Sequence, residues 1–204
     1  MSLDFLPNGD LAAVVTYLEM TEPPAEPVPA TSLQLRRIRP TLDDYRALFR
    51  KIGAPWLWFS RLAMADAELE AIITDPGVEL LEVAAVEAVV GMLELDFRTA
   101  GECEIAFIGL VPSLTGEGHG RWLIAEAVHR AWREGVTRVH VHTCSLDHPA
   151  ALAAYRRAGF VPYKRAIERF RDPRLAGILP TDAAPQLPLL GTDTPARPCP
   201  DSWA

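Results

Sequence analysis

Three glycines that alternate with other residues separate an apolar run from a helical pattern near the middle of the chain. The stretch over residues 110–121 reads LVPSLTGEGHGR. Glycine has no Cβ atom, so successive backbone N–H groups can turn toward one ligand, and the ligand can approach the main chain closely. The pattern therefore predicts a strand, a tight turn that can surround phosphate oxygens, and the start of a helix.

Apolar residues recur at three- and four-residue spacing after the glycines, which predicts a helix that begins near His119 and is closed by Gly135. The first N–H groups of a helix lack partners within it, and the helix dipole is positive there. An anion could therefore bind without a lysine. The periodic residues are Leu123, Ile124, Ala127, Val128, Ala131 and Trp132.

The glycine spacing excludes two common phosphate-binding motifs. The third glycine follows the second after one residue, so the dinucleotide fingerprint Gly-x-Gly-x-x-Gly is not met. No Gly-Lys-Ser/Thr follows either, which excludes the Walker loop. Any phosphate site here must rely on a different arrangement of the same backbone chemistry.

Composition limits the kind of protein and the kind of partner. With 204 residues, 49% of them apolar, the chain can bury a core as one domain with extensions. The formal charge of −7, without a lysine or arginine run, argues against a nucleic-acid or membrane partner and favours a cationic substrate. Residues 1–7 do not resemble a signal peptide and no apolar run reaches ~18 residues, so we expect a soluble, cytoplasmic protein.

The three cysteines are Cys103, Cys144 and Cys199, and they lack the spacing of metal ligands. Their odd number in a chain without a secretory signal predicts free thiols. His140 and His142 alternate with valines on one predicted strand, so both face the same side. They could ligate a metal, but no third ligand is near in sequence, and a polar face lining a cleft is the better interpretation. We therefore expect no bound metal.

Residues 1–30 are expected to hold an extra strand, from Leu11 to Met20, and a proline-rich linker. The strand could be an added edge strand of the main sheet, which is the simpler prediction, or an arm that packs on a partner chain in a homodimer. Residues 31–171 would form the main domain. Residues 172–204 would form a proline-rich tail without a core of its own, either disordered or draped over the surface.

The main domain is predicted to alternate strands and helices. We expect a strand from Leu33 to Pro40, a helix from Leu42 to Ile52 capped by Thr41, and a second helix near residues 65–74. A hairpin over residues 78–97 and a strand from Cys103 to Val111 follow. After the glycine-loop helix come a strand over 138–143, a helix from His148 to Ala158 and a strand over 160–170.

Two features of this domain have alternative interpretations. Gly109 interrupts its strand, so it marks a bulge, a close approach of a ligand's amide chain to the main chain, or tight packing. The aromatic passage Trp56–Phe59 either packs on the sheet, or else Trp58 or Arg61 lines the pocket of an acceptor substrate.

Two motifs of this sequence resemble those of the GNAT superfamily of acyl-CoA-dependent N-acyltransferases. Residues Thr115–Gly120 resemble its pyrophosphate-binding pattern, Arg/Gln-x-x-Gly-x-Gly/Ala, with Thr115 in place of a long donor. Residues His148–Phe160 resemble its later pattern, Asn-x-x-Ala-x-x-x-Tyr-x-x-x-Gly-Phe, with His148 in place of asparagine. The order of predicted elements is similar to the GNAT fold from about Leu33 to Phe170.

The resemblance implies a mixed α/β fold with a mostly antiparallel central sheet, flanking helices and a pyrophosphate loop between a strand and a helix. It implies acetyl transfer from acetyl-CoA, a cosubstrate, to a primary amine by direct attack. Tyr155 would be the general acid, and Glu104 and His142 compete as the base. The residues expected at acetyl-CoA are Ile108, Gly109, Leu110, Thr115, Gly116, Glu117, Gly118, His119, Gly120, Arg121 and His148.

Two other functions are compatible with the same motifs. An acyl-CoA sensor would keep the glycine turn without the acid and base, and the presence of Tyr155 speaks against it. An assembly protein would use the N-terminal strand and the tail. Because a fold does not define its function, the sequence leaves the amine acceptor unidentified.

Overall fold

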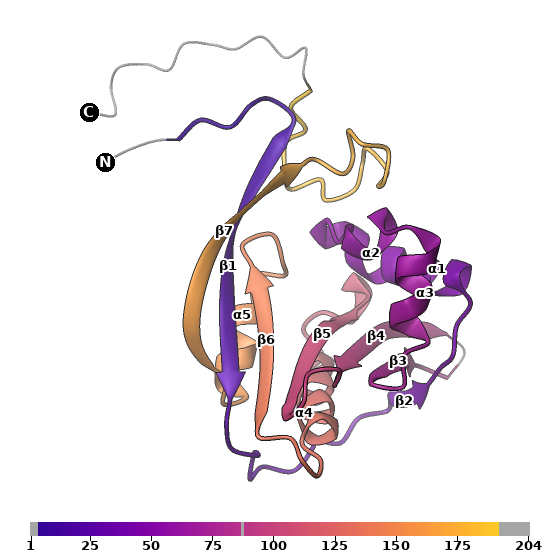
Figure 1. Cartoon of the computed structure of the whole chain (residues 1–204), viewed down its shortest axis with the longest axis vertical. Helices are drawn as coiled ribbons and strands as arrows, with labels where there is room; N and C mark the ends of the chain where they lie inside the picture. The colour runs from indigo at the N-terminus through magenta and orange to yellow at the C-terminus, as the bar shows by residue number, and fades with distance from the viewer. Residues whose placement is uncertain (1–3, 87, 192–204) are drawn as a thin grey trace.

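The computed structural model of the chain describes residues 4–86 and 88–191, which contain one seven-stranded sheet in the order β2-β3-β4-β5-β6-β1-β7 (Figure 1). Neighbouring strands are antiparallel except β5 and β6, which are parallel. The predicted mixed α/β fold is confirmed. The strands are β1 (Asp10–Met20), β2 (Gln34–Arg37), β3 (Val78–Ala84), β4 (Val89–Asp96), β5 (Glu102–Leu110), β6 (Arg138–Cys144) and β7 (Val161–Arg171).

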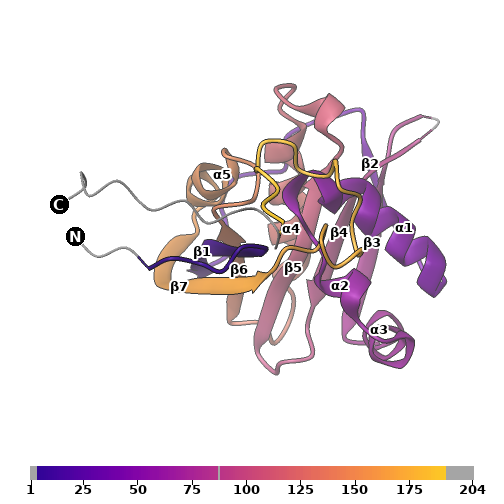
Figure 2. The ribbon, with the colours of Figure 1, turned by 90° about the horizontal axis from the view of Figure 1, so that it is seen from above.

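Helices cover both faces of the sheet (Figure 2). Along β3 and β4 alternate residues point to opposite faces, so Leu81 and Leu93 join the core that contains α4, whereas Leu80 and Met92 join the core that contains α1. The helices are α1 (Leu42–Gly53), α2 (Ser60–Ala63), α3 (Asp66–Ile73), α4 (His119–Ala131) and α5 (Ala151–Arg157), with short 3₁₀ turns η1 (Ala54–Trp56) and η2 (Pro112–Leu114).

The predicted cap of α1 and the predicted start of α4 are confirmed, whereas the end of α4 differs. Thr41 caps α1 by accepting a hydrogen bond from the Asp44 backbone N–H at 3.2 Å. Helix α4 begins at His119, but it ends at Ala131, and Gly135 lies in the turn after it. No helix of the described ranges is long and apolar enough to cross a bilayer.

The prediction that the N-terminal strand lies at an edge of the sheet is wrong. Strand β1 pairs with β6 on one side and with β7 on the other, so it is an interior strand. An interior strand must bury its middle, and β1 has charged residues only near its ends, at Asp10 and Glu19. Leu18 is fully buried in the core beside α4.

Residues 172–191, the described part of the predicted tail, pack on the rest of the protein. Leu179, Ala183 and Ala184 pack with Leu57, beside η1 and α2. A buried ion pair between Arg174 and Asp172, at 2.7 Å, holds the segment, because the guanidinium also donates to backbone oxygens there. The rest of the predicted tail, with Cys199, lies outside the described residues.

Candidate active site

The sheet opens between its two parallel strands. Strands β5 and β6 pair only from Glu102 to Glu104, opposite Arg138 to His140. Just beyond, Ala106 is an extra residue of β5 without a partner on β4, which makes a bulge. A bulge bends its strand, so β5 diverges from β6 and leaves a V-shaped opening (Figure 1).

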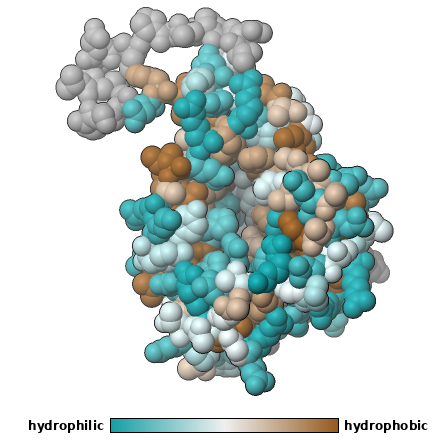
Figure 3. Space-filling view, in the orientation of Figure 1, coloured by the Kyte–Doolittle hydropathy of each residue, from teal (hydrophilic) through white to brown (hydrophobic). Residues whose placement is uncertain are grey.

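A cavity of about 1090 Å³ occupies this opening. One end lies at the glycine loop and the first turns of α4, and the other reaches β1, β7 and the aromatic passage after α1. The surface is hollowed between the β1–β7 pair and helices α1–α3 (Figure 3). Lining residues predicted from the sequence are Ile108, Gly109, Leu110, Thr115, Gly116, Gly118, Gly120, Arg121, His142, His148, Tyr155 and Trp58.

The glycine loop presents bare main chain to the cavity. Gly116 and Gly118 have φ values of +91° and +83°, a conformation that L side chains rarely adopt, and a Cβ atom on either would meet nothing within 4 Å. Gly118 is the N-cap of α4 and has no side-chain capping bond. Within the described residues, no acceptor is found for the N–H groups of Gly116, Gly118 and His119. The loop can therefore bind an anion.

The proline-rich linker before β2 forms part of the wall at this end. Pro24 to Pro27 and Pro29 line the cavity, and the Glu26 carbonyl oxygen lies 2.9 Å from Nε2 of His129 on α4. The Thr31 hydroxyl lies 3.0 Å from Nδ1 of His119. His119 and Glu117, which are 3.2 Å apart, support the loop from outside the cavity lining. This contact was not predicted, because the composition of the linker indicated only an extended connector.

Strand β5 has main-chain groups that face the opening. The Val111 N–H donates to the Val90 carbonyl on β4 at 2.8 Å, and backbone groups alternate along a strand, so those of Ile108 and Leu110 point away from β4. Gly109 is explained by tight packing, one of its three predicted roles, since a Cβ atom there would lie 2.7 Å from Cγ2 of Ile52.

Tyr155 lies on α5 with its ring buried against Phe160. Its side chain lines the cavity, and its hydroxyl has no hydrogen-bond partner among the residues that the structure describes. Burial raises its pKa above the usual value for tyrosine. The group is therefore protonated at neutral pH and can donate a hydrogen bond to a ligand in the cavity.

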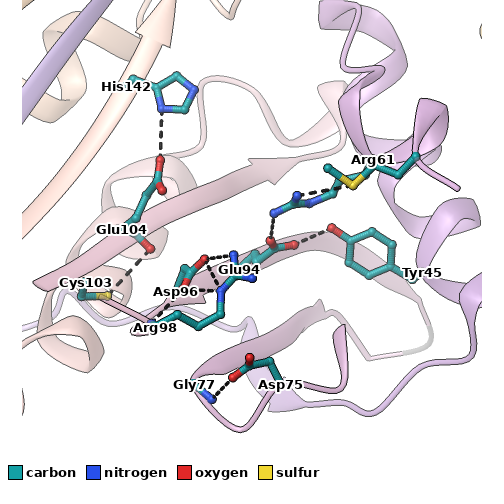
Figure 4. A network of polar contacts seen from close by, with 11 residues as sticks. Tyr45, Arg61, Asp75, Gly77, Glu94, Asp96, Arg98, Cys103, Glu104 and His142 are labelled. Carbon is teal, nitrogen blue, oxygen red and sulfur yellow. Dashed lines mark hydrogen bonds and ion pairs between the residues drawn. The ribbon is translucent and has the colours of Figure 1, made fainter. Parts of the chain in front are cut away.

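His142 and Glu104 form a pair across the opening, with Nδ1 of the imidazole 3.3 Å from a carboxylate oxygen (Figure 4). The hydrogen bond between them raises the pKa of His142 and lowers the pKa of Glu104. His142 lines the cavity, whereas Glu104 does not. Glu104 is thus placed behind the imidazole, where it can orient the ring. His140, the other histidine of β6, lies 3.5 Å from Glu102.

Trp58 connects the two sides of the opening. Its Nε1 donates to Asp147, just after β6, at 3.1 Å, and its ring packs on Phe107 of β5. His148 also has a structural contact, because its Nδ1 accepts a hydrogen bond from the Ala150 N–H at 3.1 Å. Both side chains still line the cavity.

Arg61, expected at the acceptor, does not line the cavity. Its guanidinium lies 2.6 Å from Glu94, which also accepts a hydrogen bond from the Tyr45 hydroxyl (Figure 4). Burial lowers the pKa of Arg61, but the Glu94 carboxylate more than offsets it and the pKa is raised. The three buried side chains join α1, α2 and β4, so Arg61 has a structural contact that its place beside the aromatic passage did not reveal.

Sequence reasoning missed the residues that line the far end of the cavity. Glu168 and Phe170 come from β7, Val15 from β1 and Phe59 from the segment before α2. These residues are distant in sequence and belong to no shared motif. They meet only because β1 lies between β6 and β7.

The sheet, its opened centre and the glycine loop define a GNAT-like α/β fold. The model of the acetyltransferase (GNAT) family matches residues 43–160, more than half of the chain. The chain therefore belongs to the GNAT acetyltransferase family. No curated protein matches it.

Solved structures of GNAT proteins have a similar fold. A GCN5-related N-acetyltransferase from Sphaerobacter thermophilus is 24% identical, with a TM-score of 0.52 over 81% of this chain and 52% of that one. Another from Kribbella flavida is 20% identical, with a TM-score of 0.52 over 83% and 63%. This chain thus spans about half to two thirds of their length. An aminoglycoside acetyltransferase from an uncultured soil metagenomic sample, crystallised with sisomicin, is 16% identical with a TM-score of 0.50 over 63% and 88%.

Proposed function

We propose that this protein transfers the acetyl group of acetyl-CoA to a primary amine by direct attack on the thioester. The observation that supports this most is the single cavity of about 1090 Å³ that joins the glycine loop to His142. Such a cavity can hold both reactants at once, which direct transfer requires.

Acetyl-CoA fits the chemistry of the loop end. The N–H groups of Gly116, Gly118 and His119, at the positive end of α4, would hold its diphosphate, with the exposed Arg121–Glu26 pair beside them. The main-chain groups of Ile108 and Leu110 would pair with the amides of the pantetheine arm. His148 and Thr115, which also line the cavity, would contact the cofactor as well.

The side chains at the centre supply the proton transfers. With Nδ1–H donated to Glu104, Nε2 of His142 is free to take a proton from the acceptor's ammonium, directly or through water. The amine nitrogen then bonds to the thioester carbon, the carbon–sulfur bond breaks, and the departing sulfur takes the proton of Tyr155. The nitrogen gives up its second proton as the amide forms, and this proton restores the Tyr155 hydroxyl through solvent. The β5 main chain would stabilise the oxyanion that forms between these steps.

A covalent route through a cysteine is disfavoured. Cys144 lines the cavity, but burial raises its pKa to about 11, so the thiol is protonated and weakly nucleophilic at neutral pH. The amine is therefore the attacking group in this proposal.

A thiol-release assay with acetyl-CoA and a panel of amines tests the function, with product mass confirming the gain of one acetyl group. We expect at least one amine to be acetylated, with Gly118→Asp as the inactive control. Binding of acetyl-CoA without turnover of any amine would instead support the sensor, and no binding at all would leave an assembly role.

A further inference from the structure

The two ends of the cavity differ in the charged groups that line them. The end at the glycine loop has the N-terminus of α4 and Arg121, whose guanidinium lies 3.4 Å from Glu26, whereas the far end has the carboxylates of Asp147 and Glu168. Attraction falls with distance, so each end favours the ligand charge opposite to its own. The loop end suits an anionic cofactor, and the far end suits a cation.

Asp147 already accepts hydrogen bonds from three groups of the protein. Its two oxygens accept hydrogen bonds from Trp58 at 3.1 Å, from the Thr143 hydroxyl at 2.8 Å and from the Cys144 N–H at 2.8 Å. Glu104 is likewise paired with His142. These two carboxylates hold the site together and have little capacity left for a ligand.

Glu168 is different, because the described part of the chain offers it no hydrogen bond or ion pair. Two cations of β7 close to it in sequence have other contacts. Arg169 pairs with Asp10 at 3.0 Å, and the Lys164 ammonium lies over the Tyr17 ring at 5.5 Å from its centroid. A carboxylate that lines a cavity without a partner is available to a cationic ligand.

The sheet register places Glu168 on the same face as His142. Glu168 lies opposite Ala13 of β1, and His142 lies opposite Tyr17, four residues further along the same strand. Their backbones are therefore separated by about 13 Å along the strands and two strand spacings, about 10 Å, across them. Both side chains line the cavity, so a ligand bound at both must be several bonds long.

Glu168 is exposed to solvent, and apolar side chains line the cavity at the same end. The rings of Phe59 and Phe170 lie 5.0 Å apart, and both line the cavity with Val15. Methylene groups can pack on these rings, and an ammonium group gains from their π faces. A carboxylate or phosphate on the acceptor would meet Glu168 with the wrong sign.

We infer that the acceptor is an aliphatic di- or polyamine, with one amine reacting at His142 and a second ammonium paired with Glu168. This inference rests on the proposed acetyl transfer and specifies its substrate class. Glu168 is then a specificity-determining residue, which selects a second positive charge at a distance set by the sheet.

The test compares kcat/KM for α,ω-diamines of increasing length with the n-alkylamines of the same length, in the full chain. The wild type should prefer diamines, and longer ones most, by about 10- to 100-fold, the range of a charge-assisted hydrogen bond. In Glu168→Gln that ratio should fall toward one, and in Glu168→Lys it should fall below one. Glu134→Gln, which removes a carboxylate outside the cavity lining, is the matched control and should keep the wild-type ratio.

Equal use of monoamines and diamines by the wild type, or a diamine preference that survives in Glu168→Gln, would overturn the inference while leaving acetyl transfer intact. If no amine is turned over, calorimetry of a long diamine with CoA-loaded protein tests the predicted class of ligand separately from acetyl transfer. Binding that Glu168→Gln weakens would support the class of ligand, although acetyl transfer had failed. Absence of binding would overturn both.

Discussion

The loop end and the far end of the cavity are built from different parts of the molecule. At the loop end, the main chain of Gly116 and Gly118 lines the cavity, directly before α4 begins at His119. At the far end, the groups are side chains such as His142 and Glu168, which come from strands β6 and β7. The first end depends on local backbone conformation, and the second depends on the order of strands in the sheet. Substitutions should therefore separate them, affecting cofactor binding at one end and turnover at the other.

The largest effect is expected from Gly118→Asp. The residue has a φ of +83°, so any side chain strains the loop, and a carboxylate would repel the diphosphate where it binds. Calorimetry should show acetyl-CoA affinity falling by more than about 100-fold, the effect of losing ~3 kcal/mol of binding energy. Gly135→Asp is the control, because its φ is +86° but it does not line the cavity. Equal losses in both variants would mean that strain, and not the site, is responsible.

His142→Ala should act on turnover alone. Loss of the general base is expected to lower kcat by about 10²- to 10⁴-fold with any accepted amine, while the affinity for acetyl-CoA stays unchanged. The rate–pH profile should also lose its acidic limb. An unchanged kcat and limb would show that the base is another group or water.

Tyr155→Phe should lower kcat by about 10²-fold or somewhat less, because a thiolate can leave unaided at neutral pH and gains only part of the usual benefit from a general acid. The ring and its packing on Phe160 remain, so stability and the KM for acetyl-CoA should barely change. Steady-state kinetics of the purified variant measure this. A wild-type kcat would make Tyr155 a packing residue and would favour the sensor function.

Gly109→Ala should act on the scaffold between the two ends. The new methyl group would lie 2.7 Å from Ile52 and 3.2 Å from Trp58, and overpacking of this kind costs about 1–3 kcal/mol of the free energy of unfolding. Gly120→Ala is the control, since its methyl group meets nothing within 4 Å. Urea unfolding measures the free energy of unfolding of both variants. An equal loss in Gly109→Ala and Gly120→Ala would contradict the packing explanation.

Glu104→Gln is expected to give the smallest change, a shift in pH dependence. The hydrogen bond that His142 donates to Glu104 is the main cause that raises the pKa of His142, with Asp147 and Glu168 adding to it, while burial opposes them. A base must be neutral to act, so activity rises as pH passes this raised pKa. Removing the Glu104 charge should move the acidic limb to lower pH, whereas loss of the limb would identify Glu104 as the base. The Tyr17 ring, whose centroid lies 5.7 Å from that of the His142 ring, and the Lys164 ammonium over it are the same in this variant.

The contrast between the ends also explains what the sequence could predict. The start of α4 at His119, the cap at Thr41 and the glycine turn follow from residues a few positions apart, and local chemistry defines them. The sequence identified His142 and Glu104 only as competing bases, and their pairing follows from the parallel alignment of β5 and β6, which was not predicted. The order of helices and strands along the chain was predictable because it also depends on local sequence patterns.

The far end could not be predicted, because it depends on contacts between distant segments. Strand β1 inserts between β6 and β7, more than a hundred residues away in sequence, and this insertion brings Glu168 to the face of His142. The bulge at Ala106 that opens the sheet has no glycine to mark it. Arg61 appeared suitable for a substrate, but tertiary structure buries it with Glu94.

The most direct test of the central claim is one calorimetric series, in which acetyl-CoA is titrated into the wild type, His142→Ala and Gly118→Asp. If the loop end alone binds the cofactor, the wild type and His142→Ala should give the same Kd, and Gly118→Asp should give no measurable binding. A Gly118→Asp protein that is folded and retains the wild-type Kd, or a His142→Ala protein that loses it, would contradict the division of the cavity into a cofactor end and an acceptor end.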